Sequence, residues 1–90
     1  MGIKIDNSVS YDVNEAKKIL TLNFRDKYFA TVGIMTVAKD FFNIQNEDFE
    51  KVRSQVYENF RELKNETRTE DYPLKMSVIY KKSKLILEKE

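Results

Sequence analysis

The chain has 90 residues, with 16 Lys and Arg against 15 Asp and Glu, so its formal net charge is +1. It contains no Cys, no His and only two Gly. These absences exclude disulfides, thiol nucleophiles, metal sites built from His or Cys, and glycine-rich phosphate loops. A chain of this length holds one domain, so we expect a single small domain over residues 1–90.

Apolar and polar residues alternate through three segments of the first 24 residues, and this period of two predicts a meander of strands. The apolar positions are Ile3 and Ile5, then Val9, Tyr11 and Val13, then Leu20, Leu22 and Phe24. Asn14-Glu15-Ala16 has the composition of a turn between the last two segments. A short helix through Val13, Ala16 and Leu20 is the alternative for this region.

The segment from Tyr28 to Val37 is apolar or small on both faces and rich in β-branched residues. This composition predicts a central strand that is covered on both sides. Arg25-Asp26-Lys27 is a polar break before it, where we expect a tight hairpin connection. Gly33 lies within the predicted strand and indicates a bulge or a close contact with a neighbouring segment.

The clearest element is a helix from Asn46 to Asn65, because its apolar residues recur at spacings of three and four. They are Phe49, Val52, Val56, Phe60 and Leu63. We expect Asn46 to be the N-cap and Asn65 to be a left-handed residue at the C-terminal end. Beyond it, residues 74–80 and 85–88 alternate again, and Lys81-Lys82-Ser83-Lys84 reads as the turn of a C-terminal hairpin.

This order of elements predicts an α+β fold. It combines an antiparallel-rich sheet, made of the N-terminal meander and the C-terminal hairpin, with one long amphipathic helix packed on a face. Strand order across the sheet stays open at this point.

Charges on the predicted helix separate by sign at about 100° per residue. One side of the apolar stripe carries Arg53, Tyr57, Arg61 and Lys64, here called the basic flank. The other side, here called the acidic flank, carries Asp48, Glu58, Glu62 and Glu66. The functional interpretation is that the basic flank contacts an anionic partner. The alternative is an ordinary solvated flank whose arginines lie over the edge of the sheet.

Phe41, Phe42 and Ile44 form an apolar cluster just before the helix, where a polar connection would be usual. One interpretation is a lid that closes the end of the core. The other is a docking or dimerisation patch in which Phe41 and Phe42 act as exposed anchors.

A nucleic-acid interface is the second functional hypothesis. It would use Arg53 and Arg61 together with the lysines of the last hairpin, Lys81, Lys82 and Lys84. Against it, a net charge of +1 is low for a nucleic-acid-binding domain, and lysines at an edge hairpin commonly prevent aggregation.

Catalysis has little support in the residue types present. The acidic groups lie at the predicted helix N-terminus or in turns, and none has the spacing of a calcium loop. We therefore expect no enzyme activity, no metal and no cofactor.

The prediction for function is a small non-catalytic protein-binding module: an adaptor, inhibitor or regulator located in the cytoplasm. No run is long and apolar enough to cross a membrane. Twelve lysines against four arginines, with seven each of Asn and Ile, reflect A/T-rich codons and indicate a low-GC bacterium, a phage or a mobile element. Homo-oligomerisation, for instance as a homodimer, stays open, because so small a core is thinly stabilised.

Overall fold

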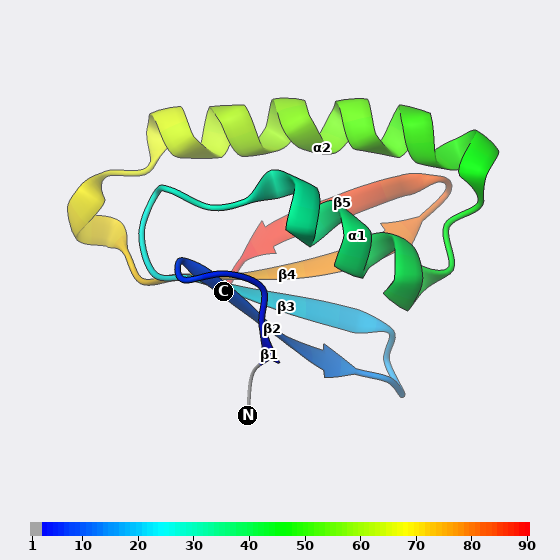
Figure 1. Cartoon of the computed structure of the whole chain (residues 1–90), viewed down its shortest axis with the longest axis horizontal. Coiled ribbons are helices and arrows are strands. Elements are labelled where there is room, and N and C mark those ends of the chain that lie inside the picture. Colours follow the sequence, from blue (N-terminus) through cyan, green and yellow to red (C-terminus); the bar gives the residue numbers. More distant parts are fainter. Residues whose placement is uncertain (1–2) are drawn as a thin grey trace.

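Five strands form one antiparallel sheet in the computed structural model of the chain, which describes residues 3–90. Their order across the sheet follows their order in the chain (Figure 1). Two helices and a short 3-10 helix (η1) connect the third strand to the fourth. The elements are β1 (Ile3–Lys4), β2 (Val9–Asn14), β3 (Ile19–Phe24), α1 (Thr31–Phe42), α2 (Asn46–Glu66), η1 (Thr69–Asp71), β4 (Leu74–Lys81) and β5 (Lys84–Lys89).

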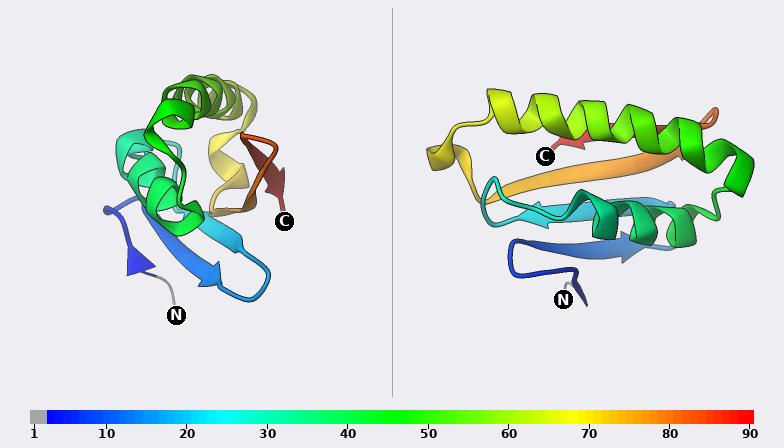
Figure 2. Two further views of the ribbon diagram at one scale, coloured as in Figure 1. Left: turned by 90° about the vertical axis from the view of Figure 1, so that its right-hand side faces the viewer. Right: turned by 45° about the horizontal axis from the view of Figure 1, so that its top comes forward.

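Both helices cover the same face of the sheet, and the core lies between them and the strands (Figures 1 and 2). Side chains alternate across a strand, so every second residue of β3, β4 and β5 enters this core. Its fully buried members include Leu20, Leu22, Phe24, Met35, Val52, Val56, Phe60 and Leu85. The α+β fold with its meander, hairpin and long helix is therefore confirmed, but a second helix, α1, joins it.

The predicted alternation of strands holds in both halves of the chain. β2 and β3 pair from Val9–Phe24 to Asn14–Ile19, so the alternative of a short helix through this region is wrong. The turn between β4 and β5 is also where the sequence predicts it. Lys82 and Ser83 have φ values of 52° and 62°, as a two-residue hairpin turn requires.

The predicted central strand from Tyr28 to Val37 is wrong, because α1 begins at Thr31 within it. Arg25-Asp26-Lys27 accordingly starts the loop that leads into α1 and is not a hairpin connection. Side chains on one side of α1 are buried, those of Ile34, Met35 and Ala38. Their burial against the core outweighs the helix cost of the β-branched residues, about 0.5 kcal/mol or less each.

Gly33 does mark a close contact, as the sequence predicts. A Cβ atom at this position would lie only 2.6 Å from Cγ2 of Ile5. The missing side chain thus lets α1 approach the turn between β1 and β2.

The ends of α2 differ slightly from the prediction. Gln45 is the N-cap, and Asn46 is the first helical residue. The helix continues to Glu66, and its C-cap Thr67 has a φ of −87°, so Asn65 does not take a left-handed conformation there. The left-handed residue is Asn43, which ends α1 with a φ of 53°.

Candidate functional site

A groove of about 380 Å³ opens between the start of α1 and the C-terminal half of α2. Most of its lining is apolar, and two cations stand at its rim. The residues of this helix groove are Ala30, Thr31, Val32, Tyr57, Phe60, Arg61 and Lys64. Three members of the predicted basic flank, Tyr57, Arg61 and Lys64, therefore face α1. Arg53 lies farther towards the N-terminus of α2 and is not part of the lining.

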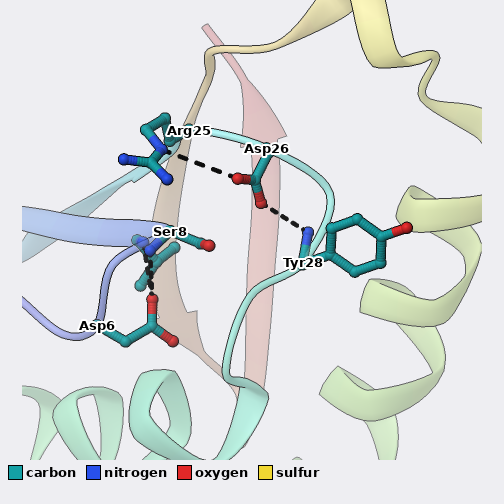
Figure 3. A network of polar contacts seen from close by, with 6 residues as sticks. Asp6, Ser8, Arg25, Asp26 and Tyr28 are labelled. Atoms are coloured by element: carbon teal, nitrogen blue, oxygen red, sulfur yellow. Dashed lines mark hydrogen bonds and ion pairs between the residues drawn. The ribbon is translucent and has the colours of Figure 1, made fainter.

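The carboxylate of Asp6, which Figure 3 shows beside Ser8, also holds the start of α1 in place through Ala30. Its Oδ1 accepts hydrogen bonds from the backbone N–H groups of Ser8 at 2.7 Å and Val9 at 3.0 Å. Its Oδ2 accepts one from the N–H of Ala30 at 3.2 Å. Asp6 thus ties the turn between β1 and β2 to one wall of the helix groove.

Asp26 shapes the loop that precedes this wall. Its Oδ1 accepts a hydrogen bond from the backbone N–H of Tyr28 at 2.9 Å, which closes a local turn. Figure 3 shows the Tyr28 ring directed away from the turn that contains Asp6 and Ser8. Tyr28 as a whole residue is 73% exposed.

An aromatic cluster lies beside the helix groove, and Phe60 is the member that lines it. Phe60 lies 5.5 Å from Phe29 and 6.1 Å from Phe24, measured between ring centroids, and both contacts are edge-to-face. Nζ of Lys64 lies 4.7 Å from the centroid of the Phe29 ring, within the range of a cation–π interaction. Phe60 therefore joins the lining of the groove to the core, and Lys64 brings a positive charge to the same lining.

Large apolar side chains remain exposed around this groove. Val32 is 68% exposed and Tyr57 is 39% exposed, and both line it. Isolated exposed apolar residues are ordinary, but two such residues that share one concave surface resemble a binding site.

The basic flank is partly neutralised within α2 itself. Arg53 pairs with Glu50 at 2.6 Å, and Arg61 pairs with Glu58. Both pairs are exposed, where ion pairs contribute little to stability and exchange readily with other partners. Arg61 therefore keeps its capacity to bind a carboxylate from outside.

The residues of the nucleic-acid hypothesis do not form one patch. Gln55 hydrogen-bonds Leu85, so the hairpin of β4 and β5 lies beside the flank of α2 that faces away from α1. Lys82 lies in the exposed turn, and Lys81 and Lys84 project from the face of the sheet opposite the buried Leu85. Arg61 lines the helix groove. The sheet therefore lies between these lysines and the helix groove.

Phe41 and Phe42 lie at the C-terminal end of α1, away from the helix groove. Their ring centroids are 4.8 Å apart, Phe42 contacts Tyr80 at 6.1 Å, and Lys18 lies over Phe41 at 5.2 Å. Both are half-buried and pack against the core, while Ile44 is fully buried. The structure therefore places them as partners of the core that still reach the surface.

The acidic side chains of residues 3–90 do not converge on a common point. Within this range, no group of three or more acidic side chains is arranged to hold a metal ion. Neither α1 nor α2 combines the length and the hydropathy needed to cross a membrane.

The sequence did not reveal the α1 wall of the helix groove, because Tyr28 to Val37 reads as a strand. A helical signal is nevertheless present: Ile34, Ala38 and Phe41 recur at spacings of four and three. With that helix in place, the groove beside Tyr57 and Lys64 would have been predictable.

Comparisons with known proteins give no match for this chain: no family model, no curated protein and no solved structure.

Proposed function

We propose that this protein is a small non-catalytic module that binds another protein through the helix groove. One observation carries the proposal. The exposed side chains of Val32 and Tyr57 line the same open groove as Arg61 and Lys64, together with the ring of Phe60. Apolar anchors within a charged rim are typical of protein-binding sites.

The chemistry of the groove selects an acidic partner segment with an apolar anchor. Phe60 and Val32 offer apolar contact for an aliphatic or aromatic side chain. Arg61 and Lys64 attract carboxylates at the rim.

A random displayed-peptide library tests this proposal with defined ligands. We expect selected peptides to carry an apolar residue next to Asp or Glu, and to shift the backbone amide signals of Val32, Tyr57 and Lys64 in an NMR titration. Val32→Ser should weaken their binding about tenfold or more, since losing a buried anchor costs more than about 1 kcal/mol. The matched control is Ile86→Ser, which removes an exposed apolar residue from the sheet.

A charge reversal separates the helix groove from the lysine hairpin. Lys64→Glu should abolish peptide binding, whereas Lys82→Glu makes the same change of charge outside the groove and should leave binding intact. Equal losses for both variants would contradict the proposal. Binding of labelled DNA or RNA that falls steeply with salt and depends on Lys82 would favour the nucleic-acid alternative.

A further inference from the structure

The outer edge of β5 exposes backbone groups that no strand uses. In an antiparallel pair, every second residue bonds to the partner strand. The turn at Lys82 and Ser83 makes Lys84 bond with Lys81, and the Glu90 N–H donates to the Lys75 carbonyl at 3.0 Å. The backbone groups of the intervening residues, Leu85, Leu87 and Lys89, therefore point away from the sheet.

The side chain of Gln55 in α2 hydrogen-bonds the backbone groups of the first of these residues, Leu85. Its Nε2 donates to the Leu85 carbonyl at 2.9 Å, and its Oε1 accepts from the Leu85 N–H at 3.3 Å. The side-chain amide thus takes the place of a neighbouring strand. Within residues 3–90, no hydrogen bond is formed by the backbone groups of Leu87 and Lys89 that face outwards.

A second groove of about 260 Å³ lies beside this open edge, on the far side of α2 from the helix groove. Leu63, Met76 and Leu87 supply its apolar surface, and Glu62 and Glu66 of the acidic flank also line it. Across the part of the chain that the structure describes, neither glutamate forms an ion pair. Lys89 is the one basic side chain of β5 on this side of the sheet, and it is exposed.

We propose that the edge of β5 binds an extended segment of a partner protein, with basic residues two positions from an apolar one, as a sixth strand. Backbone groups of Leu87 and Lys89 would bond the segment, its apolar side chain would enter the groove at Leu63 and Met76, and its basic residues would meet Glu62 and Glu66. A second copy of this chain fits less well, because pairing two β5 edges would bring two acidic flanks together.

This proposal is independent of the helix groove, which lies on the opposite flank of α2 and prefers the opposite charge.

Amide hydrogen exchange of the full chain tests whether the edge of β5 is open in the free protein. We expect the N–H groups of Ile86 and Glu88 to be protected and those of Leu87 and Lys89 to exchange rapidly. Protection of Leu87 and Lys89 that grows with protein concentration would instead identify a second copy on the edge and overturn the proposal.

A short, blocked peptide with lysine, valine and lysine at every second position and threonine between them is the binding probe, because alternate residues of a strand share one face. It should protect the Leu87 and Lys89 amides and leave the Val32 amide signal unchanged. The same peptide N-methylated at every residue should not bind, because it has no backbone hydrogen-bond donor on either edge. Equal binding of both peptides, or no binding of either, would overturn the proposal.

Two variants with matched controls locate the site. Lys89→Pro removes an N–H that the sheet does not use, and should weaken the peptide about threefold to tenfold relative to Lys89→Ala. Glu66→Gln should weaken it and reduce its salt dependence, whereas Glu47→Gln, at the other end of α2, should do neither. Identical affinities for each variant and its control would contradict the proposed site.

Discussion

Two hydroxyl groups near the C-terminal end of α2 are buried without a good hydrogen bond. Neither Oγ1 of Thr67 nor the hydroxyl of Tyr72 has a partner with hydrogen-bonding geometry among the described residues. Burial raises the pKa of Tyr72 above its usual value of 10.0. The nearby Thr67 hydroxyl opposes this rise in the pKa of Tyr72, whereas the negative charges of Asp26 and Asp71 add to it.

The raised pKa predicts alkaline sensitivity. Because the unfolded chain ionises Tyr72 at a lower pH than the folded chain does, its contribution to stability is complete below pH 10 and is lost as pH rises through the folded-state pKa. Urea unfolding at neutral and alkaline pH should show a smaller alkaline loss for Tyr72→Phe than for the original chain. At neutral pH this variant should be as stable or more stable, since it removes an unpaired hydroxyl. An unchanged alkaline loss would contradict this assignment.

At the scale of elements, α1 depends on one close approach. Gly33 faces Cγ2 of Ile5 with no room for a Cβ, and Asp6 next to it holds the Ala30 N–H. The short strand β1 and the turn that follows it therefore position the start of α1. This explains how a two-residue strand at the edge of the sheet contributes to the helix groove.

Gly33→Ala tests the contact between Gly33 and Ile5. Although alanine favours a helix, the clash should lower the free energy of unfolding by about 1–3 kcal/mol. Thr36→Ala, on the exposed side of the same helix, should be neutral or stabilising. In an Ile5→Ala background, which lacks the clashing methyl group, the cost of Gly33→Ala should shrink in urea unfolding. The same cost in both backgrounds would contradict the contact.

The strands and α2 were predictable because their hydrophobic period agrees with their tertiary burial. Leu20, Leu22 and Phe24 follow a period of two and are all buried. α1 was not predictable in this way, since Val32 and Thr36 suggest a strand while Ile34 and Ala38 follow a helix. Local β-propensity and helical spacing conflict there, and only packing against α2 and the sheet decides between them.

At the scale of the whole molecule, α2 separates two surfaces of opposite charge. The sequence predicted both flanks from the helical period, and thus Tyr57, Arg61 and Lys64 of the helix groove. It did not indicate what each flank faces. That depends on α1 lying beside one flank and β5 beside the other, a consequence of topology that no local pattern encodes.

The sheet order has a consequence for how the chain assembles. Three of the four strand pairings join strands that are separated by a short turn. The fourth joins β3 to β4, and both helices lie between these two strands in the chain. Closing that long connection is the largest entropic step, so the centre of the sheet should form later than its margins. We expect Leu22→Ala, at the β3–β4 junction, to accelerate unfolding more than it slows refolding in stopped-flow experiments. If the loss of stability appeared entirely as slower refolding, the contact between β3 and β4 would belong to the folding nucleus instead.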